Sequence, residues 1–135
     1  MKHALLFICT SFLLSLSSTA QDKGNEHLLD GTSMNYYYQN GSGVHVQFAD
    51  GKFNWKWIAG PDTVSTGSEQ YLSRKIGDKT YMINFKNSAN SDFVTIVFNF
   101  NQNVIFTSAL LDPKTPQEQI LFEGGIIEHL KLKEN

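Results

Sequence analysis

Cysteine is almost absent from this chain of 135 residues, where Cys9 is the only one. A lone cysteine cannot close a disulfide within the chain, so stability must come from the core. Basic residues are also few, 11 Lys and Arg against 13 Asp and Glu, and the net charge is −2. This mildly acidic balance argues against nucleic acid or an anionic membrane surface as a partner. No apolar run reaches the length of a membrane span, and no long amphipathic helix is indicated.

The N-terminus has the pattern of an export signal. A basic start precedes a mostly apolar stretch over 4–16, and small residues at 18–20 fit a cleavage site. Cleavage after Ala20 would remove Cys9 and leave about 115 residues, the size of one domain. We expect an exported protein, periplasmic or secreted, that does not insert into a membrane after cleavage. Its predicted parts are a signal peptide (1–20), a polar lead-in (21–30) and one domain (31–135).

Eight short apolar runs follow, separated by turns rich in Gly, Asn and Asp. This spacing is typical of antiparallel hairpins, and it predicts an all-β fold of about eight strands. A closed β-barrel is the favoured architecture and a sandwich is the alternative. Thr115-Pro116-Gln117-Glu118 has the capping pattern of one short helical turn. The interior of an eight-stranded barrel is wide enough for packed side chains or one small ligand.

Alternation along the strands predicts which side chains face inward. In the segment 52–57, aromatic residues alternate with Lys and Asn, so a one-residue slip would bury two lysines and expose two tryptophans. Asp50-Gly51 fits a type I′ turn, and Gly124-Gly125 indicates a bulge or a barrel corner. Residues 59–68 are the longest expected loop. The inward set of the first three strands is predicted to be Met34, Tyr36, Tyr38, Val44, Val46, Phe48, Phe53, Trp55 and Trp57.

Inward-facing aromatic residues are the candidate ligand-binding residues. Their rings offer apolar contact, and tyrosine hydroxyls and indole N–H groups can orient a ligand. Spacing alone favours plain core packing for the same residues, since aromatics are ordinary in strands. The candidates are Tyr36, Tyr38, Trp55, Trp57, Tyr81 and Phe85.

The sequence offers no complete catalytic or metal-binding pattern. His27, His45 and His129 lack metal-ligand spacing, and no serine lies in a G-x-S-x-G context. Nothing in the sequence buries the carboxylates as an acid–base pair. We therefore expect no metal, no cofactor and no catalytic residues.

The segment Phe93–Phe100 is apolar on both faces of its predicted strand. Val94, Ile96 and Phe98 lie on one face, and Phe93 and Val97 lie on the other. Such a strand is covered on both sides or contributes to a homodimer surface.

Several short motifs together resemble the MoaF-like domain family, over roughly Gly31 to Leu111. The motifs are Tyr36-x-Tyr38-x-Asn40-Gly41, Val44 to Phe48, Asp50-Gly51, Trp55-x-Trp57, Gly60 and Tyr81-x-Ile83-x-Phe85. This family is similar in turn to bacterial phenolic acid decarboxylases. The resemblance implies a lipocalin-like (calycin) β-barrel.

The decarboxylases hold their substrate with two tyrosines that match Tyr36 and Tyr38. Their arginine has no match, because residues 63–71 contain none, and Lys86-Asn87 stands where their glutamate is expected. The resemblance therefore implies binding of a small apolar or aromatic molecule in the barrel rather than catalysis. The alternatives are an enzyme acting on a phenolic acid or similar molecule, and a protein-interaction module that uses an exposed sheet face.

Overall fold

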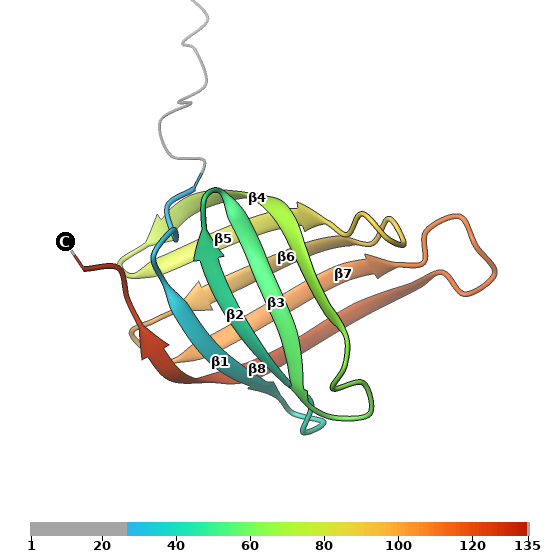
Figure 1. Ribbon diagram of the computed structural model, residues 1–135, viewed down its shortest axis with the longest axis horizontal. Coiled ribbons are helices and arrows are strands. Elements are labelled where there is room, and N and C mark those ends of the chain that lie inside the picture. Colours follow the sequence, from blue (N-terminus) through green and yellow to red (C-terminus); the bar gives the residue numbers. More distant parts are fainter. Residues whose placement is uncertain (1–26, 135) are drawn as a thin grey trace, which may run out of the picture.

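The computed structural model describes residues 27–134, which form a closed barrel of eight antiparallel strands (Figure 1). Each strand pairs with the next, and β8 pairs back with β1. The barrel predicted from the hairpin spacing is confirmed; the predicted signal peptide, 1–20, lies outside the described residues. None of the described segments forms a helix long and apolar enough to cross a membrane. The strands are β1 (Ser33–Tyr38), β2 (Gly43–Ala49), β3 (Lys52–Ala59), β4 (Thr66–Gly77), β5 (Thr80–Lys86), β6 (Phe93–Asn99), β7 (Val104–Leu111) and β8 (Gln119–Lys131).

The predicted alternation is confirmed in β1 and β2, where every expected inward residue is buried. Asp50 and Gly51 have φ angles of 52° and 72°, as a type I′ turn requires at both central positions. In β3, Phe53 is buried, while Lys52 and Lys56 are exposed. The hydrophobic pattern therefore fixes the register of the β1–β2–β3 meander.

Aromatic packing fills the barrel around Phe48. Its ring centroid lies 4.9 Å from that of Tyr71, 5.3 Å from that of Phe53 and 5.8 Å from that of Phe98. All four side chains are almost fully buried. These rings supply much of the apolar burial that stabilises the barrel, since residues 27–134 contain no cysteine to form a disulfide.

The segment before β1 closes one end of the barrel (Figure 1). Leu29 lies in the core with 2% of its surface exposed. Asp30 accepts hydrogen bonds from the Gly51 amide at 2.9 Å and from the Tyr71 hydroxyl at 2.8 Å. The described part of the polar lead-in is therefore held against the barrel. One apolar side chain and one carboxylate in this polar stretch suffice to bind it to the barrel.

The loop predicted over 59–68 is shorter in the structure, because β4 begins at Thr66. Gly67 is typical of a loop, yet here it pairs with Trp55 across the β3–β4 ladder. A Cβ atom at Gly67 would lie 2.5 Å from Cε2 of that indole. Glycine occupies this strand position because the tryptophan ring needs the space.

The predicted helical turn is a hydrogen-bonded turn, and no helix occurs within 27–134. Thr115 accepts from the Glu118 amide through its carbonyl and from the Gln117 amide through its Oγ1, both at 3.1 Å. The capping contacts are thus present, but β8 begins at Gln119 and leaves no residues to extend them into a helix.

The glycine pair in β8 lies in regular β7–β8 pairing rather than at a bulge. A Cβ atom at Gly125 would lie 2.5 Å from the Tyr37 carbonyl oxygen, so glycine allows β8 and β1 to approach closely. The irregularity in the β1–β8 pairing comes later in β8, where His129 has a φ of 50°.

Candidate functional site

The end of the barrel opposite Leu29 opens into a cavity of about 420 Å³. The connections β1–β2, β3–β4, β5–β6 and β7–β8 all lie at this end (Figure 1). Phe48 and its neighbours fill the closed end, and this cavity lies in the open half. Six aromatic side chains contribute to the walls: Tyr36, Tyr38, Phe53, Trp55, Trp57 and Phe85.

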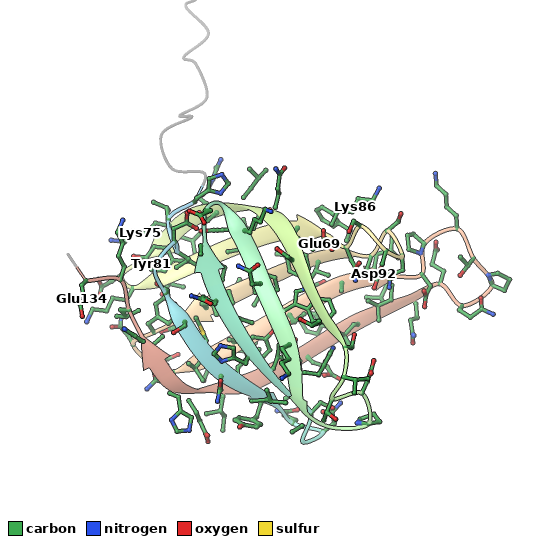
Figure 2. All side chains as sticks on the ribbon, viewed as in Figure 1. Glu69, Lys75, Tyr81, Lys86, Asp92 and Glu134 are labelled. Atoms are coloured by element: carbon green, nitrogen blue, oxygen red, sulfur yellow. The ribbon has the colours of Figure 1, made fainter. Side chains whose placement is uncertain are left out.

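The cavity contains five of the six residues predicted to bind a ligand. The exception is Tyr81, whose ring packs 5.8 Å from that of Phe100 and is not among the lining residues. Figure 2 shows Tyr81 near Lys75, away from Asp92, which lines the cavity. Alternation along β5 correctly predicted that Tyr81 and Phe85 face inward. Only the C-terminal half of that strand reaches the open end, so Phe85 lines the cavity and Tyr81 does not.

The tyrosine pair lies at the inner wall of the cavity. Tyr36 and Tyr38 are 3% and 8% exposed, and their rings meet edge to face with centroids 5.4 Å apart. The Tyr38 hydroxyl lies 3.1 Å from Oγ1 of Thr107, within hydrogen-bond distance. Burial raises the pKa of Tyr38, and burial together with the neighbouring Tyr38 raises the pKa of Tyr36 further. Both hydroxyls therefore stay protonated at neutral pH and can donate or accept hydrogen bonds.

Trp55 and Trp57 are only partly buried, although the strand pattern predicted a buried face for both. They face inward as expected, but they line the open cavity instead of touching other side chains on all sides. Trp57 contacts the tyrosine pair, with its centroid 6.4 Å from that of Tyr38. The Trp55 Nε1 is out of contact with water and has no hydrogen-bond partner among residues 27–134. Trp55 therefore offers its ring surface to the cavity rather than its N–H.

Three carboxylates line the cavity, and sequence reasoning had not assigned them to it: Asp62, Asp92 and Glu123. Glu123 lies opposite Thr107 in the β7–β8 pairing and is close enough to Tyr38 to raise the pKa of its hydroxyl. Asp92 accepts hydrogen bonds from the Asn90 side chain and from the Asp112 amide, both at 2.7 Å, and so joins the β5–β6 loop to the end of β7. The alternation along β8 could have predicted this, because Glu123 lies on the same face of the strand as the inward Leu121 and Ile127.

The β5–β6 loop is also held from the other side. Glu69, on β4, accepts hydrogen bonds from the amide and from the hydroxyl of Ser88, both at 3.0 Å. Figure 2 shows Glu69 and Asp92 at the open half of the barrel. The rim of the cavity is therefore held at a defined position on both sides of this loop.

The three histidines among residues 27–134 do not line the cavity. His45 is hydrogen-bonded through Nδ1 to Oδ1 of Asn35 at 2.7 Å, the His27 ring packs 5.1 Å from Tyr71, and His129 is exposed. Among residues 27–134, no three His, Cys, Asp or Glu side chains are grouped in a way that could hold a metal.

A wider hollow of about 630 Å³ lies around the middle of β4. Its lining includes the exposed side chains Gln70, Leu72, Lys86 and Phe93. The cavity at the open end of the barrel has six aromatic side chains in its lining, against Tyr71, Phe85 and Phe93 here, and is the stronger candidate site.

The outer face of β6, β7 and β8 is apolar and exposed. Phe93 pairs with Leu110 and Leu110 with Ile120, which forms one row across the three strands. Phe106, Phe122 and Ile126 extend the surface, and Phe122 is 82% exposed. The predicted two-sided apolar strand β6 is thus covered on its inner face only.

Comparison with protein families gives a match to the MoaF N-terminal domain over residues 24–110. This span is more than half of the chain. The chain belongs to the MoaF family. The match covers the tyrosine pair and both tryptophans, while Glu123 lies beyond it.

Solved structures support the same fold. One match is the crystal structure of a Burkholderia vietnamiensis protein described provisionally as a beta-lactamase, with a TM-score of 0.66 and 16% identity over 74% of this chain and 93% of that one. At this identity the likeness shows the fold of the MoaF-family barrel and not its activity. No curated protein matches the sequence.

Proposed function

We propose that this MoaF-family protein is exported and binds a small, partly aromatic or apolar molecule non-covalently inside the barrel. The observation that carries the proposal is the cavity of about 420 Å³ next to the tyrosine pair. Its volume falls in the range of about 300–1,000 Å³ that is common for small-molecule sites. Aromatic walls with a few polar groups are also the usual composition of such sites.

Titration with 2-phenylethanol, followed by tryptophan fluorescence and calorimetry, tests this function. Trp55 and Trp57 are the only tryptophans in the chain and both line the cavity, so binding should change the emission. Replacing Tyr36 and Tyr38 together by Phe should weaken binding by about 1–3 kcal/mol, because hydrogen bonds to a buried polar ligand group are lost. Tyr37→Phe, on the opposite face of β1, is the matched control. Unchanged affinity in the double variant would contradict the proposed site.

Export is a separate part of the proposal and rests on the sequence of residues 1–20. Intact-mass measurement of secreted or periplasmic material should give a chain that begins at Gln21. Exported protein that retains residues 1–20 would contradict it.

An enzyme acting on a phenolic acid is the second candidate, because the carboxyl group of Glu123 lines the same cavity as Tyr38. General acid–base chemistry needs such a group within reach of the substrate. The cavity lining within 27–134 contains no Lys, Arg or His to bind the substrate carboxylate. We therefore expect no turnover of coumaric or ferulic acid at ordinary enzyme rates, about 1–10³ per second. Release of carbon dioxide from either acid at such rates would favour the enzyme.

A homodimer through the outer face of β6–β8 is a further proposal. The rows through Phe93, Phe106 and Phe122 contain no charged residue on β6, β7 or β8, which suits an apolar contact with a second copy. Lys86 on β5, opposite Phe93, lies at the edge of this face. Light scattering should show a dimer that Phe106→Ser with Phe122→Ser converts to a monomer. Val64→Ser, at an exposed apolar residue outside this face, is the control. A wild-type monomer at high concentration would contradict the dimer.

A further inference from the structure

The cavity is lined by charge of one sign only. Three carboxylates, Asp62, Asp92 and Glu123, contribute to its lining, and no Lys, Arg or His among residues 27–134 does. A pocket with low-dielectric walls focuses the field of such charges on whatever enters it. The tyrosine hydroxyls do not add to this charge, since burial keeps them protonated.

Glu123 is the carboxylate best placed to meet a ligand. It is partly buried, it lies on the inward side of β8 opposite Thr107, and its charge acts on Tyr38 deep in the cavity. Asp92 already accepts two hydrogen bonds, from Asn90 and Asp112. Glu123 accepts none from the described residues, so its oxygens are free for a donor carried by the ligand.

Aromatic faces surround the same space. Tyr36, Tyr38, Trp55 and Trp57 line the cavity, and the ring of Trp57 stands 6.4 Å from that of Tyr38. The face of an aromatic ring attracts a cation, most strongly for tryptophan, and the attraction grows when water is excluded. An aromatic wall beside an unpaired carboxylate is thus suited to a positively charged group with an apolar body.

We infer that the ligand of this barrel carries a positive charge, and that its class is a small amine bearing an aromatic or apolar group. Glu123 pairs with the ammonium group, and the aromatic rings contact the rest of the molecule. This inference rests on the proposed function, because it specifies the ligand of the same cavity. It also separates the protein from a phenolic acid binder, since a carboxylate ligand would meet only like charge here.

Three probes of similar size, differing in charge, test the inference: 2-phenylethylamine, 2-phenylethanol and phenylacetate. We expect the amine to bind at least about tenfold more tightly than the alcohol, which is about 1.4 kcal/mol. Phenylacetate should bind more weakly than the alcohol. Calorimetry at pH 7 and low salt measures all three, and tryptophan fluorescence provides an independent readout.

A matched pair of variants locates the charge that makes the difference. Glu123→Gln keeps the size of the side chain and should remove most of the preference for the amine, measured as the ratio of the amine affinity to the alcohol affinity in the same variant. Glu128→Gln, on the same strand but exposed, should leave the preference intact. Thermal unfolding of each variant verifies that the barrel is folded.

The outcomes separate the two proposals. Binding of the alcohol without a preference for the amine overturns the charge inference and leaves the binding function standing. Phenylacetate binding as tightly as the amine, or a preference that survives Glu123→Gln, also overturns it. No binding by any of the three probes overturns both proposals.

Discussion

Tyr38 belongs to the core and to the cavity at the same time. It is 8% exposed, it packs against Tyr36 and Trp57, and its hydroxyl lies 3.1 Å from Oγ1 of Thr107. A buried hydroxyl without a partner would be costly, so Thr107 makes burial of this tyrosine tolerable. Core packing and a place in the cavity wall are therefore not alternatives for this residue, although from spacing alone they compete.

Removing one partner of this contact should destabilise the barrel. Thr107→Val removes one hydrogen bond of the buried Tyr38 hydroxyl, and we expect the free energy of unfolding to fall by about 0.5–1.5 kcal/mol. The combination with Tyr38→Phe should recover part of this loss, because both polar groups are then absent. Urea unfolding of the two single variants and the double variant measures the coupling. Strictly additive losses would show that the two oxygens do not interact.

Buried tyrosines also predict how stability depends on pH. The pKa values of Tyr36, Tyr38 and Tyr71 are raised by burial above the ordinary value of 10.0. Above about pH 10 the unfolded chain therefore releases protons that the folded barrel keeps, and stability should fall as the pH rises further. Below that pH the three residues cause no such loss. Urea unfolding at pH 8, 10 and 11 should show a shallower decline for Tyr36→Phe than for the wild type; identical declines would contradict the assignment.

At the scale of the strand, β3 and β4 show what sequence patterns can and cannot predict. Alternation placed Phe53, Trp55 and Trp57 on one face, because the two-residue period depends on local geometry alone. The start of β4 was missed, because Gly67 is a loop residue by propensity. What keeps it in the strand is the Trp55 ring across the ladder, a contact no single-strand pattern contains.

The space under the Trp55 ring can be tested directly. Gly67→Ala would put a Cβ atom 2.5 Å from the indole, so the ring or the strand must move, and we expect a loss of about 1–3 kcal/mol with altered tryptophan emission. Gly77→Ala is the control on the same strand, since its Cβ would meet only Thr80 at ordinary contact distance of 3.4 Å. That change should stay within about 0.5 kcal/mol. Equal effects would show that the close approach at Gly67 does not limit packing.

For the whole molecule, local sequence patterns predicted the strands of the barrel better than the position and lining of its cavity. Strand number and inward faces follow from periodicity, and five of six candidate residues do line the cavity. Which half of the barrel is open depends on where the aromatic rings accumulate and on Leu29 entering the other end. Glu123 reaches the cavity only through closure of β8 onto β7 and β1. These are contacts between segments far apart in the chain, which alternation within one strand does not encode.

The barrel consequently has a packed end and an open end, and the two should respond differently to truncation. Leu29→Ala removes a side chain buried at the packed end, so we expect a loss of about 2–5 kcal/mol with affinity for 2-phenylethanol unchanged within about twofold. Trp57→Ala removes a cavity wall that is only partly buried. The loss in free energy of unfolding should be smaller than the value for a fully packed tryptophan, which is about 3–5 kcal/mol. The affinity for 2-phenylethanol should fall about tenfold. Urea unfolding and calorimetry on both variants measure the two quantities. Equal weakening of binding by Leu29→Ala and Trp57→Ala would contradict this division of stability and binding between the two ends. The segment before β1 would then influence the shape of the cavity from the opposite end of the barrel.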